Sequence, residues 1–296
     1  MSRDAEDLRL FEEQRPRLIS LAYRMLGDAG RAQDLVQEAW IRWHKRTTEV
    51  DSPRGFLVTI VTRLCLNELA SPRVRLEDAG PALPEPIELG ALGLDSDLDV
   101  ERISMAFMVL LERLTPPERA VLVLHEVFDY PHDQIAELVS RSAASCRKLL
   151  ERAREKVSTG RKLIAATREE HEKLLHAFVR ARFTGDEKAL LELLAEDVTL
   201  HADGGPRGRN VGQLRNLRAP ISGAGRVAAF LKATGAAGTL ALEFHELNGR
   251  PAVVFLRDGE TFGALSIEVA DGKIQSIYFQ GDPERLRFVR RSLQAS

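Results

Sequence analysis

The sequence has few of the residues that build metal centres, disulfide frameworks or membrane spans. Its two cysteines, Cys65 and Cys146, stand far apart without metal-ligand spacing, so we expect buried thiols in a reducing compartment. No apolar run approaches the roughly 18 residues of a membrane span, and the start of the chain has no apolar signal segment. These absences predict a cytoplasmic protein without a metal, a cofactor or a membrane association.

Charge is nearly balanced over the whole chain but strongly segregated along it. The net charge is −2 at pH 7, so the total gives no indication of a nucleic-acid partner. Residues 141–162, however, contain eight basic and two acidic side chains, whereas residues 77–101 contain eight acidic and no basic ones. A length of 296 residues with 44% hydrophobic content is sufficient for two or three domains. We therefore expect the basic segment 141–162 and the acidic segment 77–101 to be the functionally important ones.

Residues 114–162 are typical of a helix-turn-helix. Thr115 to Glu118 combine an N-cap, a first-turn proline and a capping glutamate, and Tyr130-Pro131 precedes a short apolar helix. Ser142 can cap a last helix whose apolar stripe repeats at helical spacing. The opposite face of this helix is basic, which suits the major groove and its phosphates. A solvated amphipathic helix is the alternative, but the short preceding helix and the tight turn favour DNA binding.

The segments that precede this module differ in predicted secondary structure and charge. Up to about Val74 we expect three helices, the first two separated by Gly27 and Asp28 and the third starting at Ser52-Pro53. Residues 77–101 read as a flexible acidic linker that would average about 25–30 Å end to end as a coil. Its charge suits basic surfaces, either in a partner or on the protein's own DNA-binding helices.

The chain from Arg168 onward predicts an α+β domain. Two helices precede strand-like runs that are separated by Asn-Gly or Asp-Gly hairpin turns at 248, 258 and 271. The runs lie at 198–201, 240–246, 252–257, 262–269 and 274–279. We expect a curved antiparallel sheet and a short basic tail helix over 284–293.

The Asp-Leu-Val-Gln-Glu-Ala-Trp helix at 34–40, the acidic linker and the basic helix-turn-helix together resemble the extracytoplasmic-function (ECF) sigma factors of bacterial RNA polymerase, in the subgroup with a fused SnoaL-like domain. The resemblance covers essentially the whole chain. It implies two all-α sigma domains, the second with the helix-turn-helix, plus a C-terminal α+β SnoaL-like cone-shaped barrel. The implied boundaries are sigma region 2 at 1–76, the linker at 77–101, sigma region 4 at 102–162 and the SnoaL-like domain at 168–296.

The resemblance implies core RNA polymerase and promoter DNA as partners. Core polymerase would bind the helix surface formed by Asp34, Gln37, Glu38 and Trp40. The promoter −35 element would be contacted by side chains on or beside the basic helix: Arg141, Ser142, Ser145, Arg147, Lys148, Arg152 and Arg154. The melted −10 element would be captured by aromatic and basic side chains: Trp43, His44, Lys45, Arg46, Arg54, Arg63 and Asn67. For Trp43, ordinary helix packing is the alternative.

Three short segments resemble signatures of this subgroup and imply regulatory contacts. A Trp-Leu-Pro-Glu-Pro-type segment in the linker has lost its aromatic residue at Ala82 and retains Pro84, Glu85 and Pro86. An Asp-Gly-Gly loop corresponds to Asp203, Gly204 and Gly205. An Asn-Pro-Asp-Lys-Leu tail is altered to Asp282, Pro283, Glu284, Arg285 and Leu286.

The charge and the reach of the acidic linker lead to the hypothesis of regulation in cis. We expect a compact, DNA-incompetent state in which the SnoaL-like domain rests against both sigma domains and the linker, with polymerase binding shifting the population to an open state. The pairs His201/Asp203 and Glu243/His245 each share a strand face, as acid–base pairs do in cyclases of this shape. We nevertheless expect a non-enzymatic docking role. The alternative is a DNA-binding regulator with a ligand-sensing or enzymatic SnoaL-like domain; a separate anti-sigma factor is not required.

Overall fold

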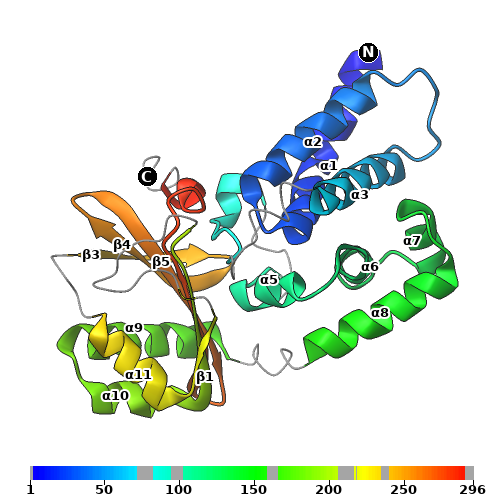
Figure 1. The fold of residues 1–296 in the computed structure, drawn as a ribbon. Coiled ribbons are helices and arrows are strands. Elements are labelled where there is room, and N and C mark those ends of the chain that lie inside the picture. Colours follow the sequence, from blue (N-terminus) through cyan, green and yellow to red (C-terminus); the bar gives the residue numbers. More distant parts are fainter. Residues whose placement is uncertain are drawn as a thin grey trace. The chain divides into compact units, whose positions relative to one another are not determined.

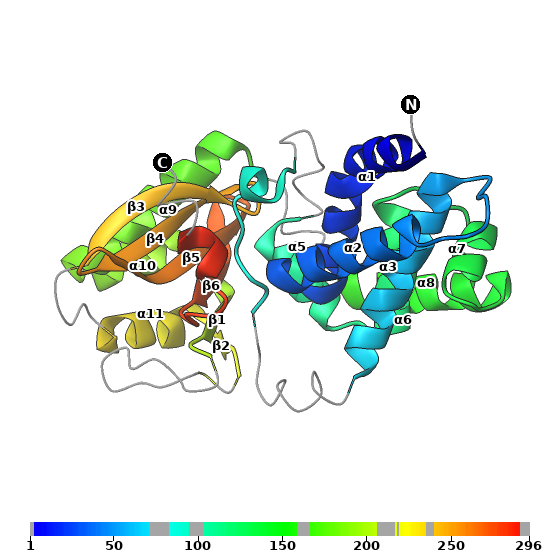
Figure 2. The ribbon, with the colours of Figure 1, turned by 90° about the horizontal axis from the view of Figure 1, so that it is seen from above.

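The protein folds into one helical and one α+β unit. The computed structural model describes residues 3–71, 83–94, 103–158, 166–205, 217, 219–234 and 240–290. The first unit comprises Met1–Glu77, Leu92–Leu98 and Met108–Thr159, and the second comprises Asp78–Ala91, Asp99–Phe107 and Gly160–Ser296. The first is helical, whereas the second combines helices with a sheet (Figures 1 and 2). The predicted fold class is confirmed.

The first helices of the chain begin at the capping residues that the sequence predicts. Between α1 (Arg3–Leu26) and α2 (Ala29–His44), Gly27 adopts a φ of 65°, and the Asp28 carboxylate accepts the backbone N–H of Arg31 at 2.8 Å. Ser52 caps α3 (Pro53–Ala70) by accepting the N–H of Gly55 at 3.2 Å. These local hydrogen bonds satisfy the amide groups that a helix leaves unpaired at its start.

The helix-turn-helix forms as its sequence pattern predicts. It contains α5 (Met105–Glu112), α6 (Pro116–Glu126), α7 (His132–Leu138) and α8 (Ala143–Ser158). The Glu118 carboxylate accepts the N–H of Thr115 at 2.9 Å, and the Ser142 hydroxyl accepts the N–H of Ser145 at 3.2 Å. The stripe of α8 that begins at Cys146 is buried, and α8 packs on α6 and α7. The basic face of α8 therefore points away from this core.

Within the first unit, the helix-turn-helix packs against α1 and α3. Helix α6 contacts α1 and α3, and α7 contacts α3. The guanidinium of Arg119, almost fully buried, donates to the carbonyl of Met25 at 2.8 Å and makes two 3.0 Å bonds with Glu112. Arg17 donates to the carbonyl of Phe128 at 3.1 Å. The two helical segments thus share polar contacts as well as apolar ones.

The sheet of the second unit has the strand order β2-β1-β6-β5-β4-β3. Its strands are β1 (Leu194–Asp203), β2 (Ile221–Ser222), β3 (Ala241–Leu247), β4 (Arg250–Arg257), β5 (Glu260–Ala270) and β6 (Lys273–Gln280). Neighbouring strands are antiparallel, as predicted, except β1 and β6, which are parallel and were not foreseen. The intervening chain is long enough to return β6 beside β1 in the same direction. The described strands form an open sheet, not a closed barrel.

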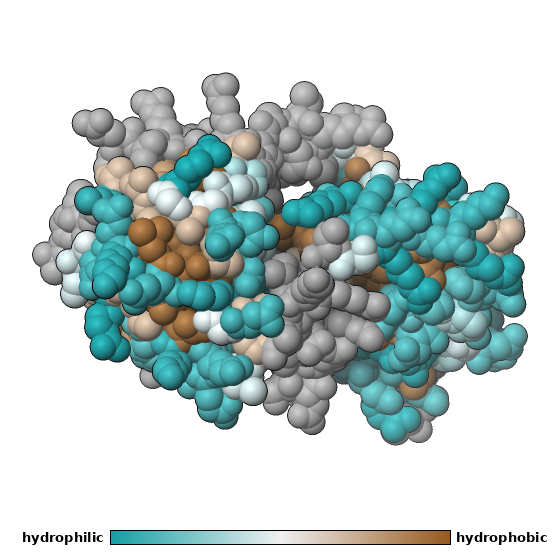
Figure 3. Space-filling view, turned by 90° about the horizontal axis from the view of Figure 1, so that it is seen from below, coloured by the Kyte–Doolittle hydropathy of each residue, from teal (hydrophilic) through white to brown (hydrophobic). Residues whose placement is uncertain are grey.

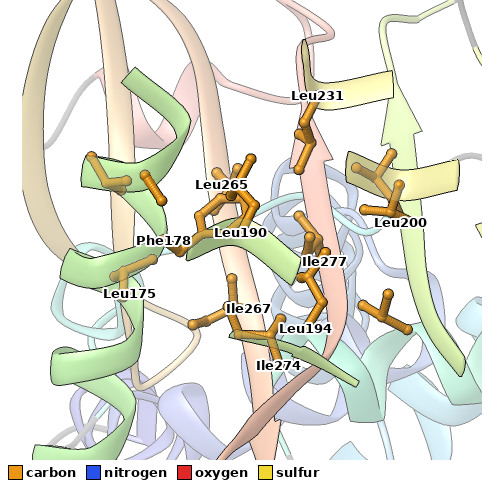
Figure 4. Close-up of a cluster of buried hydrophobic side chains, with 14 of the residues drawn as sticks. Leu175, Phe178, Leu190, Leu194, Leu200, Leu231, Leu265, Ile267, Ile274 and Ile277 are labelled. Atoms are coloured by element: carbon orange, nitrogen blue, oxygen red, sulfur yellow. The ribbon is translucent and has the colours of Figure 1, made fainter. Parts of the chain in front are cut away.

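One face of the sheet is covered by α9 (Arg168–Thr184), α10 (Glu187–Leu193) and α11 (Ala224–Ala233) (Figure 1). The side chains of Leu175 and Phe178 of α9, Leu231 of α11, and Leu265 and Ile267 of β5 belong to one apolar cluster between the helices and the sheet (Figure 4). The sequence interpretation missed α11 and β2, which follow a glycine-rich stretch. This packing fills the space between helices and sheet with apolar side chains.

The opposite face of the sheet carries a second, smaller apolar cluster. Val254 of β4 and Ala264 of β5 pack there with Leu286 and Val289 of the tail. The tail is a turn at 283–286 followed by helical residues from 287 to 290, so the predicted helix begins later than expected. Residues 291–293 of that prediction lie outside the described residues.

The described part of the acidic linker is packed, which corrects the prediction of a flexible coil. Residues 83–87 are all buried, with Leu83 at 3% and Ile87 at 0% exposure, and the short 3-10 helix η1 (Leu89–Leu92) follows. The sequence interpretation gave weight to the acidic and proline residues and overlooked the apolar ones between them. The linker residues 77–82 and 95–101 lie outside the described residues.

The polarity of the surface and the state of the two cysteines match what the sequence composition predicts. On the face shown in Figure 3, hydrophilic side chains predominate and apolar surface forms separate patches. Cys65 and Cys146 are buried free thiols, as predicted. Across the described ranges, no helix combines the length and the apolar character needed to cross a bilayer.

Candidate functional site

The turn before α8 and the exposed side of α8 bring together the residues predicted to contact the −35 element. Ser145 is half-buried in the first turn of the helix, and the other six side chains are exposed: Arg141, Ser142, Arg147, Lys148, Arg152 and Arg154. Because the apolar stripe of α8 faces α6 and α7, these side chains lie on the exposed side of the helix, where basic residues outnumber the exposed acids Glu151 and Glu155. Such a face can contact base edges near the helix start and phosphates farther along.

One of these basic side chains is already paired with an acid. The Arg154 guanidinium bonds to the Glu126 carboxylate of α6, with its Nε at 2.8 Å. The rings of His125 and His132 lie beside this pair with centroids 4.8 Å apart. Burial, followed by the charges of His125, Arg147 and Arg154, lowers the pKa of His132. The negative charge of Glu126 therefore offsets part of the positive charge of Arg147 and Arg154.

Replacing Glu126 by glutamine is expected to increase the affinity of the full chain for duplex promoter DNA. The change releases Arg154 for a phosphate and removes a nearby negative charge, so we expect a gain of about threefold at low salt, since a single exposed ion pair contributes only about 0.2–1 kcal/mol. The measurement is a binding titration at two salt concentrations. Glu151→Gln, which removes an exposed charge from α8 itself, controls for net charge. Equal gains for the two variants would contradict a specific role of Glu126.

The −10 candidates divide into exposed and buried residues. His44, Lys45, Arg54, Arg63 and Asn67 are exposed on α2, α3 and the chain between them. Exposed aromatic and basic side chains of this kind can contact unpaired bases and backbone phosphates.

Trp43 lies in the interior of the helical unit, and Arg46 packs over its ring. Trp43 is 0% exposed and donates from Nε1 to the carbonyl of Asp7 at 3.3 Å. The Arg46 guanidinium lies 3.3 Å from the centre of the Trp43 ring and bonds to both oxygens of the Asp7 carboxylate at 2.6 and 2.7 Å. The prediction that Trp43 forms part of a DNA-facing surface is therefore wrong for this structure. Its position seven residues after Val36, on the buried stripe of α2, was the available signal.

Arg63 joins the −10 candidates to the helix-turn-helix. Its Nη2 lies 3.4 Å from the carbonyl oxygen of Glu137 and 3.5 Å from the hydroxyl of Ser140. Glu137 belongs to α7, and Ser140 lies in the turn that leads to the basic helix. A residue predicted to contact one promoter element therefore touches the module predicted to contact the other.

The residues predicted to bind core polymerase share one exposed strip of α2. Asp34 and Gln37 are exposed, and Glu38 is half-buried. Asp34 pairs with Arg31 at 3.3 Å and Glu38 pairs with Arg42 along the same helix. Trp40 is partly buried, with its ring 5.0 Å from that of Phe11 and 5.4 Å from that of His44. The acidic edge of this strip is accessible, whereas the indole is partly covered.

All three signature segments meet at the backbone of Leu83 in the second unit. The N–H of Leu83 donates to Asp203 Oδ2 at 2.9 Å, and the carbonyl of Leu83 accepts from Gln280 at 3.3 Å and from Arg285 at 3.0 Å. Asp203 Oδ1 accepts the N–H of Gly205 at 2.8 Å. Asp203 is 7% exposed, and burial makes such charge-assisted hydrogen bonds more important. One linker residue is thus held by the loop and the tail together.

Gly205 fits against Asp282 where no larger residue could. Gly205 has a φ of +78°, and a Cβ added to it would lie 2.5 Å from Asp282 Cγ. Asp282 itself, 6% exposed, accepts the N–H of Glu284 at 3.0 Å and so orders the start of the tail. The Gly-Asp contact therefore packs the loop tightly on the tail.

Two acidic residues of the linker pair with basic groups of the second unit. Glu85, whose side chain is 1% exposed, accepts from Arg287 Nε at 3.1 Å. Glu88 lies 3.1 Å from His245 Nδ1, and Glu243 lies 3.2 Å from the other nitrogen of the same ring. The acidic linker was expected to contact basic surfaces of a partner or of the DNA-binding helices, and for these two residues the structure shows different basic partners. Their partners lie on the tail and β3, not on the DNA-binding helices.

Asn248 is a linker contact that the sequence interpretation missed. It was predicted only as a hairpin-turn residue, and it does occupy the turn between β3 and β4 with a φ of 52°. Its backbone N–H donates to the carbonyl of Ile87 at 2.7 Å, and its Oδ1 accepts the N–H of Ile87 at 3.2 Å. Its Nδ2 donates to the carbonyl of Ile103 at 3.0 Å. An Asn-Gly pair indicates only a local turn, so the sequence could not predict the hydrogen bonds of Asn248 to Ile87 and Ile103.

The two candidate acid–base pairs are engaged in structural contacts. The ring of His201 packs on Tyr278 with centroids 5.1 Å apart, and both oxygens of Asp203 accept backbone N–H groups. Among the residues that the structure describes, no three His, Cys, Asp or Glu side chains are arranged to hold a metal ion. The geometry of Asp203 thus suits docking of the linker.

Comparison with known proteins places these features in a family. The model of sigma-70 region 2 matches residues 10–74, and that of sigma-70, region 4 matches residues 104–157. The chain is 31% identical over 288 residues to the probable ECF RNA polymerase sigma factor SigI of Mycobacterium tuberculosis, covering 93% of each chain. It is 33% identical over 287 residues to the ECF RNA polymerase sigma factor SigJ of the same organism, covering 93% of this chain and 91% of the relative.

A solved structure extends this similarity to the three-dimensional fold. The crystal structure of the Mycobacterium tuberculosis extracytoplasmic function sigma factor SigJ matches with a TM-score of 0.73 at 28% identity, covering 95% of this chain and 98% of that one. The match includes the α+β domain as well as the helical segments. The chain belongs to the ECF RNA polymerase sigma factors.

Proposed function

We propose that this sigma factor is regulated in cis by its C-terminal α+β domain, which binds the linker between regions 2 and 4. As a sigma factor, the chain is a transcription initiation factor whose family acts with core RNA polymerase and promoter DNA. In the proposed resting state it is compact and cannot engage both promoter elements. Binding of core polymerase shifts the population toward an open state.

The anchoring of Leu83 is the observation that carries this proposal. Both backbone groups of this linker residue are bonded to side chains of the α+β domain, namely Asp203, Gln280 and Arg285. The linker joins the helical segments assigned to regions 2 and 4. A domain that holds the middle of the linker therefore limits how far these segments can separate.

The packing inside the helical unit supports a closed resting state. Promoter elements roughly 20 base pairs apart are separated by about 70 Å at 3.4 Å per step. Helix α6 instead packs directly on α1 and α3, and Arg63 contacts the turn residue Ser140. Simultaneous contact with both elements thus requires these helices to separate.

We assign roles within the open state on the same basis. The accessible acidic edge of α2, formed by Asp34, Gln37 and Glu38, binds core polymerase, with Trp40 as a partly covered apolar neighbour. The basic face of α8 contacts the −35 element. Side chains of α3 and its approach, such as Arg54, Arg63 and Asn67, contact the melted −10 element. The α+β domain acts by docking, because its Asp203 carboxylate is used to bind the linker.

Exchanging Asp203 for asparagine is expected to open the protein and raise promoter-specific transcription. Leu83 and Gly205 donate to different oxygens of Asp203, and asparagine would place an NH2 donor opposite one of these N–H groups; a lost charge-assisted hydrogen bond costs about 1.5–3 kcal/mol. With purified core polymerase and the full chain, we expect a several-fold increase in transcript and faster protease cleavage near Leu83.

The matched control is Asp258→Asn, in the exposed turn between β4 and β5, where asparagine also tolerates the φ of 53°. It should leave cleavage and transcription unchanged. The proposal fails if the Asp203 variant exposes the linker to protease without any change in transcription.

A further inference from the structure

Glu268 is a buried carboxylate that the contacts with Leu83 do not involve. It lies on β5 between Ile267 and Val269, which point into the helix-covered core, so its own side chain lies on the opposite face of the sheet. Its exposure is 3%, and its Oε1 accepts the N–H of Ala106 at 3.4 Å. Ala106 lies in the first turn of α5, the first helix of the segment matched to region 4.

Asn248 holds the same stretch of chain at Ile103, three residues before Ala106. Its Nδ2 donates to the carbonyl of Ile103, and its Oδ1 accepts the N–H of Ile87. Asn248 is 1% exposed and Ile103 is 0% exposed, so these hydrogen bonds are shielded from water. Residues 103–106 are therefore held by two buried side chains, at a site separate from Asp203.

The groups around Glu268 come from each element beside it. Arg250 of β4 contributes a positive charge, α5 contributes the Ala106 N–H, and Ser276 of β6 is the cross-strand partner. Burial raises the pKa of Glu268 to about 7, against the opposing effects of Arg250 and the Ala106 N–H. Burial, with a further contribution from Arg250, lowers the pKa of the α9 residue His171 to about 4. Of these groups, Glu268 is the one whose charge changes near neutral pH.

We propose that Asn248 and Glu268 form a second clasp, which holds the entry to region 4 and loosens when Glu268 loses its proton. The inference rests on the proposed function, because it assigns a second point of control to the same linker. The signal to which this clasp responds is a change in the surrounding pH. The Asp203 contact with Leu83 does not depend on this proton.

The direction of the pH effect follows from the two states of the carboxyl. Closing the clasp buries Glu268 and raises its pKa from the value of about 4.3 typical of an exposed glutamate to about 7. The closed state therefore binds the proton more tightly. Closure is strongest below about pH 5, weakens as the pH rises to 7, and changes little above that value, because both states are then ionised.

Hydrogen exchange of the full chain tests the clasp directly. After correction for the intrinsic exchange rate, opening at residues 103–106 should increase by up to about tenfold per pH unit between pH 5 and 7. Glu268→Gln mimics the protonated group and should abolish this pH dependence. Glu260→Gln, an exposed position of the same strand, is the matched control and should retain it.

A second variant tests Asn248 without straining the turn. Asn248→Gly keeps the left-handed φ of 52° and removes the side-chain bonds to Ile87 and Ile103. We expect faster exchange at 103–106 and unchanged exchange at Leu83. A Glu268→Gln variant with the wild-type pH profile, or an Asn248→Gly variant with wild-type protection at 103–106, would overturn the clasp. Because exchange is measured without polymerase, these outcomes are separate from the transcription test of regulation in cis.

Discussion

Trp43→Ala is expected to reduce the free energy of unfolding of the helical unit by about 4 kcal/mol, as truncation of a buried tryptophan usually costs about 3–5 kcal/mol. The indole is 0% exposed, donates to the Asp7 carbonyl and supports the Arg46 guanidinium. Its removal leaves a cavity and takes the indole contact away from the Asp7 carbonyl and the Arg46 guanidinium. Denaturant unfolding of the full chain, followed by far-UV circular dichroism, measures the loss.

Two further variants separate packing from DNA contact at this position. Trp43→Phe retains most of the apolar volume, so it should cost less and leave promoter opening unchanged. Ile41→Ala, at a 44% exposed position of the same helix, should change stability by no more than about 0.5 kcal/mol. If Trp43→Phe preserved stability but abolished promoter opening, the indole would have to leave the core and contact DNA.

Gly205→Ala is expected to destabilise the α+β domain by about 3 kcal/mol and to release the linker. The left-handed φ of +78° alone costs a non-glycine residue about 1–2 kcal/mol. The added Cβ would also lie 2.5 Å from Asp282 Cγ, so the loop and the tail must move apart. Thermal unfolding of the full chain and protease cleavage near Leu83 measure the two effects.

Gly259→Ala is the matched control for backbone strain. Gly259 has the same φ of +78°, but a Cβ there would meet nothing within 4 Å. It should cost only the conformational part and leave the linker protected. Equal losses of stability in the two variants would show that the contact between Gly205 and Asp282 is unimportant.

Features set by a few neighbouring residues could be predicted from the sequence. Helix starts at Asp28, Ser52 and Ser142 depend on a side chain bonding an N–H three residues later, and each forms as expected. The hairpin turns at Asn248 and Asp271 depend on two adjacent residues that adopt positive φ. The basic face of α8 follows from helical periodicity alone. The sequence could therefore indicate the helix-turn-helix and the strands of the α+β domain.

Features set by residues far apart in the chain were decided only by the tertiary structure. The parallel pairing of β1 with β6, the burial of Trp43 beside Asp7, and the hydrogen bonds of Leu83 with Asp203 and Arg285 all join distant segments. Local periodicity cannot show which of several polar residues will meet, because burial and hydrogen-bond partners depend on how the whole chain packs. The sequence by itself determined where the protein is helical, basic or acidic. Only the fold determined that the acidic linker is anchored, by which residues, and that Asn248 and Glu268 lie on its path.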